Sequence, residues 1–455
     1  MAARIFRLAA LALAAALVAT PPPATAQEQT LTARQMKEAA ALSISAGRPD
    51  QAVLLADALL QRDPQDIQAL LLRARASRDL GRYAASRQAA RAAWRGADAP
   101  LERYGASLAM AQALASDGRR LPAQWWLRRA AHHAPDPQLR ARALRDFRYV
   151  RERNPWSTEL HFAIAPRSNI NNGSANDTVQ LYGLPFDFQL SGAAQALSGT
   201  EISGGIATRY RLGEAGPART ELLFQLHHRT YRLSDEARRK APGVDGHDFA
   251  FSAATAGLAH SRPAGQGRVQ GAIIAGRTWY GGDPYMQLLR LAGARQWALG
   301  QRTGLTLSLA AEAQQGLGRA EDARVLRLGT GLVRVIEGGH RLHLDLGAER
   351  SHSDADWLDY SAVSAGLRLD LARPVLGLEL EMGLSARYRQ HDSSRFTTSG
   401  REETEIAAEI TAILPGVEYY GFVPSLTLRA ARTESSVALY DSEETGLHLG
   451  FRSAF

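Results

Sequence analysis

The chain has 455 residues, with 54 Lys and Arg against 46 Asp and Glu, and no cysteine. This length suffices for two domains, and the lack of cysteine excludes disulfides, thiolate metal sites, a cysteine nucleophile and a lipidated cysteine. Residues 27–157 hold 22 basic against 13 acidic residues, a net of +9, whereas residues 158–455 have a net of −3. We therefore expect an acidic client or an anionic membrane surface as a partner, and no nucleic acid.

The first 26 residues are typical of a signal peptide. Arg4 and Arg7 precede the apolar run LAALALAAALVA, and the small residues Ala24-Thr25-Ala26 follow a proline break. This order predicts cleavage before Gln27 and export from the cytoplasm. No later stretch reaches the roughly 20 apolar residues of a spanning helix, so any later membrane span must consist of strands.

Residues 27–153 carry a helical repeat. Gly81 follows Gly47 by 34 residues, and Gly118 arrives three residues later than that period requires. Both Gly47 and Gly118 are followed 17 residues later by proline, as in a tetratricopeptide repeat. We predict three tetratricopeptide-like units and a closing helix around ARALRDFRYVRER, together forming a periplasmic domain.

Stacked helix pairs of this kind leave a concave surface that holds a peptide or protein segment. Arginine suits such a groove because its guanidinium binds carboxylates and backbone carbonyls. An alternative is that these arginines only solvate an alanine-rich bundle. The candidate client-binding residues are Arg73, Arg87, Arg91, Arg128 and Arg129.

From residue 154 to 455 the apolar residues recur with period two. In LGLELEMGLSARYRQ, Leu376, Leu380 and Leu384 alternate with charged residues such as Glu381 and Arg387. This alternation predicts strands with one apolar face, but a soluble sandwich and a membrane barrel share it. Reading the polar face as a lumen gives a mixed lining, which includes Glu379, Glu381, Arg387, Arg389, Glu403, Glu405 and Glu409.

Loop lengths distinguish the two folds. We count about 14 strand candidates, joined alternately by tight turns and by longer polar connections, with YGGDP as a brief exception. That asymmetry is typical of outer-membrane barrels. The predicted fold is therefore an N-terminal tetratricopeptide-like α-helical domain followed by a transmembrane antiparallel β-barrel of about 14 strands, in the outer membrane of a Gram-negative cell.

The chain ends in an alternating strand, GLHLGFRSAF, whose last residue is aromatic. Leu449, Phe451 and Phe455 fall on one face of it. We interpret these three residues as a barrel-assembly signal, which makes the barrel assembly machinery and outer-membrane lipid expected partners.

The junction STELHFAIAPRSNINNGSAND resembles the start of the barrel in the Slam family, the surface lipoprotein assembly modulators, also grouped as type XI secretion translocators. The order of helical domain and barrel matches that family over the whole mature chain. The resemblance implies a translocator that receives a client protein, either a lipoprotein or a soluble haem- or metal-acquisition protein, and moves it outside. The motif residues are Ser168, Asn169, Asn171, Asn172, Gly173 and Ser174.

The segment from Pro166 to Ser198 is too long for an ordinary strand connection. Such a segment could fold inward to constrict the lumen or to grip a passing chain. The alternative is a mobile surface loop.

We expect no enzymatic activity, no cofactor and no metal. His391-Asp392 could serve as an acid/base pair, but polar loops collect such neighbours by chance. His227 and His228 are adjacent on a strand and must face opposite sides. Two other functions stay open: an outer-membrane exporter of exopolysaccharide, some of which also join tetratricopeptide repeats to a barrel, and a plain porin or receptor.

Overall fold

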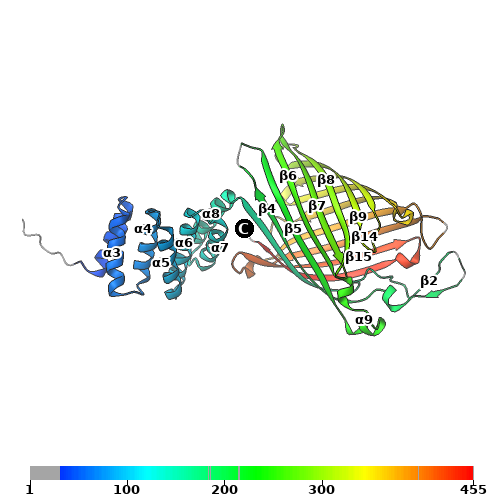
Figure 1. Ribbon diagram of the computed structural model, residues 1–455, viewed down its shortest axis with the longest axis horizontal. Coiled ribbons are helices and arrows are strands. Elements are labelled where there is room, and N and C mark those ends of the chain that lie inside the picture. Colours follow the sequence, from blue (N-terminus) through cyan, green and yellow to red (C-terminus); the bar gives the residue numbers. More distant parts are fainter. Residues whose placement is uncertain (1–30, 183, 185, 214–215, 398, 454–455) are drawn as a thin grey trace, which may run out of the picture. The chain divides into compact units, whose positions relative to one another are not determined.

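The computed structural model describes residues 31–182, 184, 186–213, 216–397 and 399–453. The predicted signal peptide and Phe455 therefore lie outside the described residues. The chain divides into two compact units, the first ending at Asp98 and the second beginning at Ala99. Figure 1 traces both from the N-terminal helices to the barrel strands.

The first unit consists of α2 (Ala33–Ser45), α3 (Pro49–Arg62), α4 (Ile67–Asp79) and α5 (Tyr83–Gly96). Alanine dominates where the helices cross, because its small side chain lets two backbones approach closely. Ala40, Ala52 and Ala76 are fully buried in one cluster. Asp66 caps α4 by accepting from the Ala69 N–H at 3.1 Å.

The repeated glycines end the first helix of each pair. Gly47, Gly81 and Gly118 have φ of 71°, 73° and 73°, a left-handed conformation that costs glycine little. The residue after each donates its N–H five residues back, as Arg48 does to the Ser43 carbonyl at 2.8 Å. The predicted helical repeat is confirmed.

In the second unit, α6 (Pro100–Ser116) and α7 (Arg120–His133) form the third pair, and α8 (Pro137–Arg153) is the predicted closing helix. Tyr104, Ala130, Ala131 and Ala143 form their shared core. Two residues separate the end of α8 from the start of the first strand.

Within the part of the chain that the structure describes, fourteen strands then form one closed antiparallel barrel, in chain order, with the last strand beside the first. The predicted barrel and strand number are confirmed. The strands are β1 (Trp156–Arg167), β4 (Gly199–Arg211), β5 (Arg219–Leu233), β6 (Phe251–Pro263), β7 (Gly267–Tyr280), β8 (Asp283–Ala298), β9 (Thr303–Gly316), β10 (Ala323–Val335), β11 (Arg341–Ser353), β12 (Tyr360–Asp370), β13 (Glu379–His391), β14 (Arg401–Ile413), β15 (Phe422–Ser435) and β16 (Ser442–Ser453).

We call the end of the barrel where β1 begins the helical end, and the opposite end the far end. Tight turns close the helical end. Two of them are two-residue hairpins with positive φ at both central positions, Leu376-Gly377 and Tyr420-Gly421. Leu376, predicted on the apolar face of a strand, instead occupies such a turn, because β13 begins only at Glu379.

Longer connections lie at the far end, where α9 (Asp235–Lys240) and the short strands β2 (Thr178–Val179) and β3 (Phe188–Gln189) are found. The brief YGGDP connection is also there. Gly281 and Gly282, with φ of 59° and 89°, allow its tight hairpin between β7 and β8. The predicted alternation of short and long connections is thus present, including its exception.

Candidate functional site

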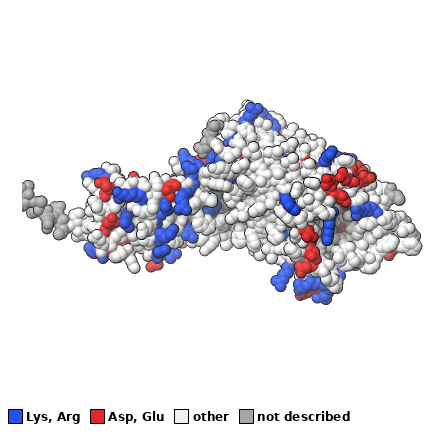
Figure 2. All heavy atoms as spheres, in the orientation of Figure 1, with Lys and Arg blue, Asp and Glu red and all other residues white. Residues whose placement is uncertain are grey.

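The outer wall of the barrel is apolar. On β1, Leu160, Phe162 and Ile164 are exposed, and the same alternation continues on the later strands with residues such as Leu291 and Leu384. Figure 2 shows one face of this wall almost free of acidic and basic residues, with charges gathered near the strand ends. A leucine exposed to water lacks the roughly 2 kcal/mol of stabilisation that burial away from water provides. This wall is therefore suited to lipid. None of the described helices is both long and apolar enough to span a membrane.

The inner wall carries arginines and glutamates in cross-strand pairs. Arg327 on β10 contacts Glu349 on β11 at 2.7 Å and Glu312 on β9 at 3.4 Å. Glu312 also binds Arg290 on β8, and Glu349 binds Arg387 on β13 at 2.9 Å. Because the charges alternate in sign, neighbouring groups neutralise one another instead of dividing the lumen into a basic and an acidic side.

The same pattern continues on the next strands. Arg389 on β13 contacts Glu403 on β14 at 3.1 Å, and Arg429 on β15 lies 3.6 Å from Glu405. Lumen residues predicted from the alternation therefore do meet inside the barrel. Their pairing partners were not predictable, because they lie on other strands.

The motif residues Ser168–Ser174 form a compact bend directly after β1, which we call the clasp. The Asn169 side chain donates to the Gly173 carbonyl and accepts from the Gly173 N–H, both at 2.9 Å. Asn171 donates to the Gln195 carbonyl at 2.8 Å and accepts from the Leu197 N–H at 2.9 Å. The two ends of the long segment are thereby held together.

Packing fixes the clasp as well. Ile170 and Leu197 are buried with Tyr231, Leu233 and Ala237 in one apolar cluster. A side chain at Gly173 would place its Cβ 2.3 Å from the Gln195 carbonyl oxygen, so glycine is required there. The long segment is thus folded against β5 and α9 at this end.

The clasp also faces the lumen. Asn172, with φ of 53°, lines a hollow of about 360 Å³ together with Arg387, Arg389, Arg401 and Glu403. Further along, β2 lies beyond the barrel strands in Figure 1, and the Tyr182 N–H donates to the Phe396 carbonyl at 2.9 Å. One half of the segment therefore borders the lumen, and the other half joins the far-end loops.

Beside the clasp, β1 meets β16, and we call this junction the seam. Among the described residues, β1 pairs with β16 at Ala163↔Gly450, Ile164↔Leu449 and Arg167↔Gly446. On its other side, β1 pairs with β4 without interruption from Trp156↔Tyr210 to Arg167↔Gly199. The seam therefore has the shortest ladder of the barrel within the described chain.

Side chains supplement that short ladder. Arg167 contacts Glu201 on β4 at 2.5 Å and also binds Glu444 on β16. Ser168 donates its N–H to the Thr445 carbonyl at 3.0 Å, and its hydroxyl accepts from the Thr445 N–H at 2.8 Å. The far end of the seam is thus closed by an ion-pair cluster and by the first residue of the clasp.

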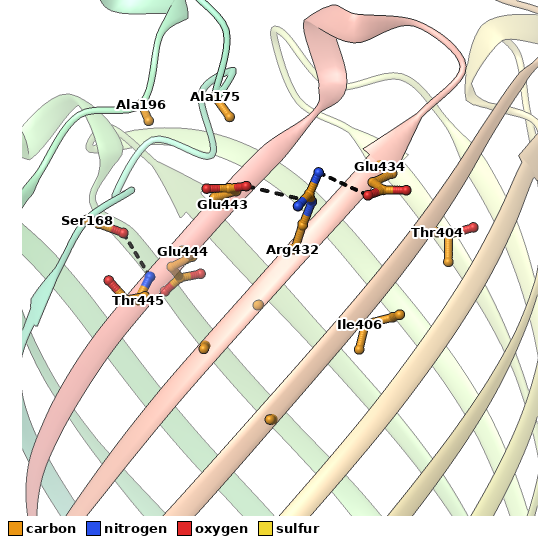
Figure 3. Close-up of a pocket in the computed structure, with 13 residues that line it drawn as sticks. Ser168, Ala175, Ala196, Thr404, Ile406, Arg432, Glu434, Glu443, Glu444 and Thr445 are labelled. Atoms are coloured by element: carbon orange, nitrogen blue, oxygen red, sulfur yellow. Dashed lines mark hydrogen bonds and ion pairs between the residues drawn. The ribbon is translucent and has the colours of Figure 1, made fainter.

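A hollow of about 700 Å³ lies beside this closure. Figure 3 shows the residues that line it. Ile406 and Thr404 of β14 line it together with Ala175 and Ala196 of the long segment, and Ser168 and Thr445 lie at its edge. Arg432 lies between Glu434 at 3.1 Å and Glu443 at 3.6 Å. Ile406 belongs to the exposed apolar set, so the hollow opens on the outside of the barrel.

At the helical end, α7 contacts the β14–β15 turn. Arg128 donates to the Gly421 carbonyl at 3.0 Å and to the Ser453 hydroxyl of β16 at 2.8 Å. Its guanidinium carbon lies 4.7 Å from the Phe422 ring centroid. The ring of His132 packs 4.3 Å from that of Tyr420.

Two further groups belong to this contact. Arg140 of α8 forms an ion pair with Glu418 in the same turn. Burial lowers the pKa of His133, and the neighbouring His132 adds to this, so its ring is neutral at neutral pH. A neutral ring is compatible with the edge contact that it makes with Tyr420, 5.9 Å between centroids.

The five arginines predicted to line the groove have different surroundings in the structure. Arg73 on α4 pairs with Asp57 at 2.7 Å, and Arg87 and Arg91 lie on α5. Arg129 stacks over Trp126 at 4.7 Å, whereas Arg128 binds the barrel turn. Sequence reasoning did not anticipate the contact of Arg128, because nothing local distinguishes it from its neighbours.

The histidine candidates have separate partners. His391 is buried and hydrogen-bonded to Arg401 at 2.8 Å, while Asp392 pairs with Arg350 at 2.6 Å. Each of the two residues therefore has a partner of its own on another strand. His227 meets His161 at 3.4 Å and His228 meets Ser252 at 2.8 Å, as expected for neighbours on opposite faces. Among the described residues, no group of three or more His, Cys, Asp or Glu could hold a metal ion.

The last described strand presents the predicted assembly residues outward. Leu449 and Phe451 are exposed on the same face of β16 as Leu447. Their role in assembly stays a prediction, as does that of Phe455.

No family model matches the sequence, and no curated protein matches it either. The helices are similar to the type III secretion translocator chaperone SycD of Yersinia enterocolitica, with 16% identity over 27% of this chain and 88% of that chain, at a TM-score of 0.24. The barrel is similar to OccAB3 of Acinetobacter baumannii, with 7% identity over 65% of this chain and 98% of that chain, at a TM-score of 0.35. It is also similar to an anion-selective porin from Comamonas acidovorans, with 10% identity over 66% and 100%, at a TM-score of 0.33.

The fold itself defines the class. A closed 14-stranded antiparallel barrel with an apolar outer wall and a charged, polar lumen is an outer-membrane β-barrel. Here the barrel follows a tetratricopeptide-like helical region.

Proposed function

We propose that this chain is an outer-membrane translocator. Its helical region captures a client protein in the periplasm, and its barrel delivers that client to the cell surface or the medium. The client is a lipoprotein or a soluble secreted protein. The resemblance of the Ser168–Ser174 junction to the Slam family supports this assignment.

The observation that carries the proposal is the direct attachment of repeat helices to the end of the barrel. α8 ends at Arg153, β1 begins at Trp156, and Arg128 of α7 binds Gly421 and Ser453. Stacked helix pairs bind extended peptide segments, and a binding surface at the mouth of a barrel concentrates its ligand there. No chemistry is needed for capture and passage.

The paired lumen charges favour this function over a selective porin. A porin that selects anions or cations needs an excess of one sign at its constriction. Here Glu312 is shared by Arg290 and Arg327, and Glu349 by Arg327 and Arg387. A wall of mutually neutralised pairs suits a passing polypeptide of mixed charge.

Surface display tests the proposal. The chain is co-expressed in a Gram-negative host with candidate clients encoded beside it, and intact cells and medium are probed with protease and antibody. We expect a client outside the cell only when this chain is present. If none is delivered while the purified protein conducts ions or passes oligosaccharides in planar bilayers, a porin or a polysaccharide exporter is the correct assignment.

Deleting residues 27–153 tests the capture role separately. We expect an inserted barrel that no longer exports the client, because the binding surface is gone. Unimpaired export by this truncated chain would contradict the role of the helices.

A further inference from the structure

The seam differs from every other strand junction in the described barrel. β1 and β16 are opposed in a register that places Phe162 opposite Phe451, yet their pairing begins only at Ala163↔Gly450. It is interrupted again between Ile164 and Arg167, where Pro166 has no N–H to donate. Each ladder hydrogen bond contributes to the cost of separating two strands, so the barrel separates most easily here.

We propose that the barrel opens laterally at the seam between β1 and β16, and that Arg167 and the clasp are the lock. Such an opening exposes a strand edge, which accepts an extended polypeptide segment by backbone pairing. The nature of the partner, a segment of a client protein, rests on the function proposed above; the opening itself does not.

At the far end, side chains reinforce the short ladder and form the lock. Arg167 connects three strands, because it belongs to β1 and binds Glu201 of β4 and Glu444 of β16. The side chains of Arg167 and Glu201 are largely buried. A charge buried in this way is costly to leave without its partner, so removing the guanidinium releases β16 from β1.

Ser168 provides the second connection. Its two hydrogen bonds to Thr445 continue the seam by one step beyond the last ladder pair, Arg167↔Gly446. Asn169, next along the clasp, donates to the Glu443 carbonyl at 3.5 Å. The position of the clasp therefore determines whether the far end of the seam is closed.

The helical end of the seam is connected to the helices. α8 leads into β1 through the backbone, whereas Arg128 of α7 holds β16 through the Ser453 hydroxyl. Arg128 also binds the Gly421 carbonyl in the turn before β15. A ligand that shifts α7 relative to α8 would therefore pull directly on the two strands of the seam.

The outside of the seam has room for an emerging chain. The hollow of about 700 Å³ lies next to the Ser168–Thr445 contact (Figure 3). The small residues Ala408 and Ala430 are among those that line it. Its position on the outer face is what a lateral opening requires, since a segment leaving through the seam arrives there.

Amide hydrogen exchange on the full chain in lipid nanodiscs tests the opening without a client. We compare the wild type with Arg167→Gln, and with Arg387→Gln as the matched control. Both arginines pair with lumen glutamates, but Arg387 lies on β13, which is fully paired with β12 and β14. Arg167→Gln is expected to raise exchange in β1 and β16 about tenfold or more, and Arg387→Gln to leave it unchanged.

A reversible disulfide cross-link provides a second test of the opening. Because the chain has no cysteine, Ala163→Cys with Gly450→Cys introduces one thiol pair across the seam. A Cβ at Gly450 would lie 3.4 Å from its nearest neighbour, so the substitution fits. Ala292→Cys with Ala310→Cys is the matched pair between β8 and β9.

Oxidation of the seam pair should suppress the exchange that Arg167→Gln causes, and reduction should restore it, whereas the β8–β9 pair should have no effect. With a client identified by surface display, oxidation of the seam pair alone should abolish delivery. The proposal is overturned if Arg167→Gln leaves exchange in β1 and β16 unchanged, or if the oxidised seam pair still delivers its client. Failure of the wild type to deliver any client contradicts the proposed function, while the exchange result still decides whether the seam opens.

Discussion

Asn169 and Gly173 bind one another twice: the Asn169 side chain donates to the Gly173 carbonyl and accepts from its N–H, each at 2.9 Å. This reciprocal pair closes the bend that leads the chain from β1 over the seam. It explains why an asparagine and a glycine stand four residues apart in the motif. The clasp is thus a built structure, which makes it open to test by substitution.

Gly173→Ala should disrupt the clasp. The added Cβ would lie 2.3 Å from the Gln195 carbonyl oxygen, so the backbone must shift at a cost of about 2 kcal/mol. We expect faster thermolysin cleavage within residues 168–198 of the detergent-solubilised protein. Gly416→Ala is the control, since no atom lies within 4 Å of the Cβ it adds. Equal cleavage of the two variants would show that the clasp tolerates the change.

Arg128→Gln should release α7 from the barrel. The substitution removes hydrogen bonds to Gly421 and Ser453, and bonds to a charged donor contribute about 1.5 to 3 kcal/mol each when they are shielded from water. Chymotrypsin should then cleave faster after Tyr419 and Tyr420, which His132 no longer covers. Arg148→Gln is the control, because Arg148 is exposed and bonds to its own helix. Unchanged cleavage in Arg128→Gln would contradict a stabilising contact.

The ion pair between Lys37 of α2 and Asp66 of α4, at 2.7 Å, should make the first unit sensitive to acid. Burial by itself would raise the pKa of Asp66, but hydrogen bonds from Lys37 and the Ala69 N–H outweigh it and hold that pKa below its ordinary value. A carboxyl group with a lowered pKa stabilises the fold above its ordinary pKa. This stabilisation is lost as the pH falls through the lowered value.

Asp66→Asn isolates the charge, because asparagine still caps α4. After screening by water we expect a loss of about 0.5 to 1 kcal/mol at pH 7. This loss should shrink as the pH falls below the ordinary value of 3.8. Thermal melts of helical circular dichroism at 222 nm measure both. Asp79→Asn is the control, since Asp79 pairs with its neighbour Arg78. A difference that does not shrink as the pH falls would assign the effect to something other than the carboxylate.

Glu312→Gln should make the lumen selective for anions. Its side chain is 2% exposed and binds both Arg290 and Arg327, so the amide leaves an excess of positive charge on that wall. Reversal potentials in planar bilayers under a KCl gradient should shift toward the chloride potential. Glu443→Gln removes the same charge from the outer face and should leave selectivity unchanged. A similar shift in both variants would contradict the placement of Glu312 in the ion path.

The barrel was predictable because its signals are local. On β11, Leu342, Leu344 and Leu346 lie on one face, and His343 and Asp345 lie on the other. This alternation follows from the pleat of a single strand. Gly47, Gly81 and Gly118 likewise each mark a local feature, the turn that ends one helix. The prediction that Leu376 lies on the apolar face of a strand was wrong for a local reason too. A two-residue hairpin interrupts an otherwise continuous apolar pattern there.

The sequence by itself determined the two kinds of structure, their order, the number of strands and the sides of the barrel wall. Only the tertiary structure decided that Arg128 binds the barrel, that Arg167 joins β1 to β4 and β16, and that the lumen charges neutralise one another. Periodicity is a property of neighbours in the chain, whereas these contacts join residues as far apart as Arg128 and Ser453. They depend on strand register and on the closure of the barrel, which no local pattern specifies.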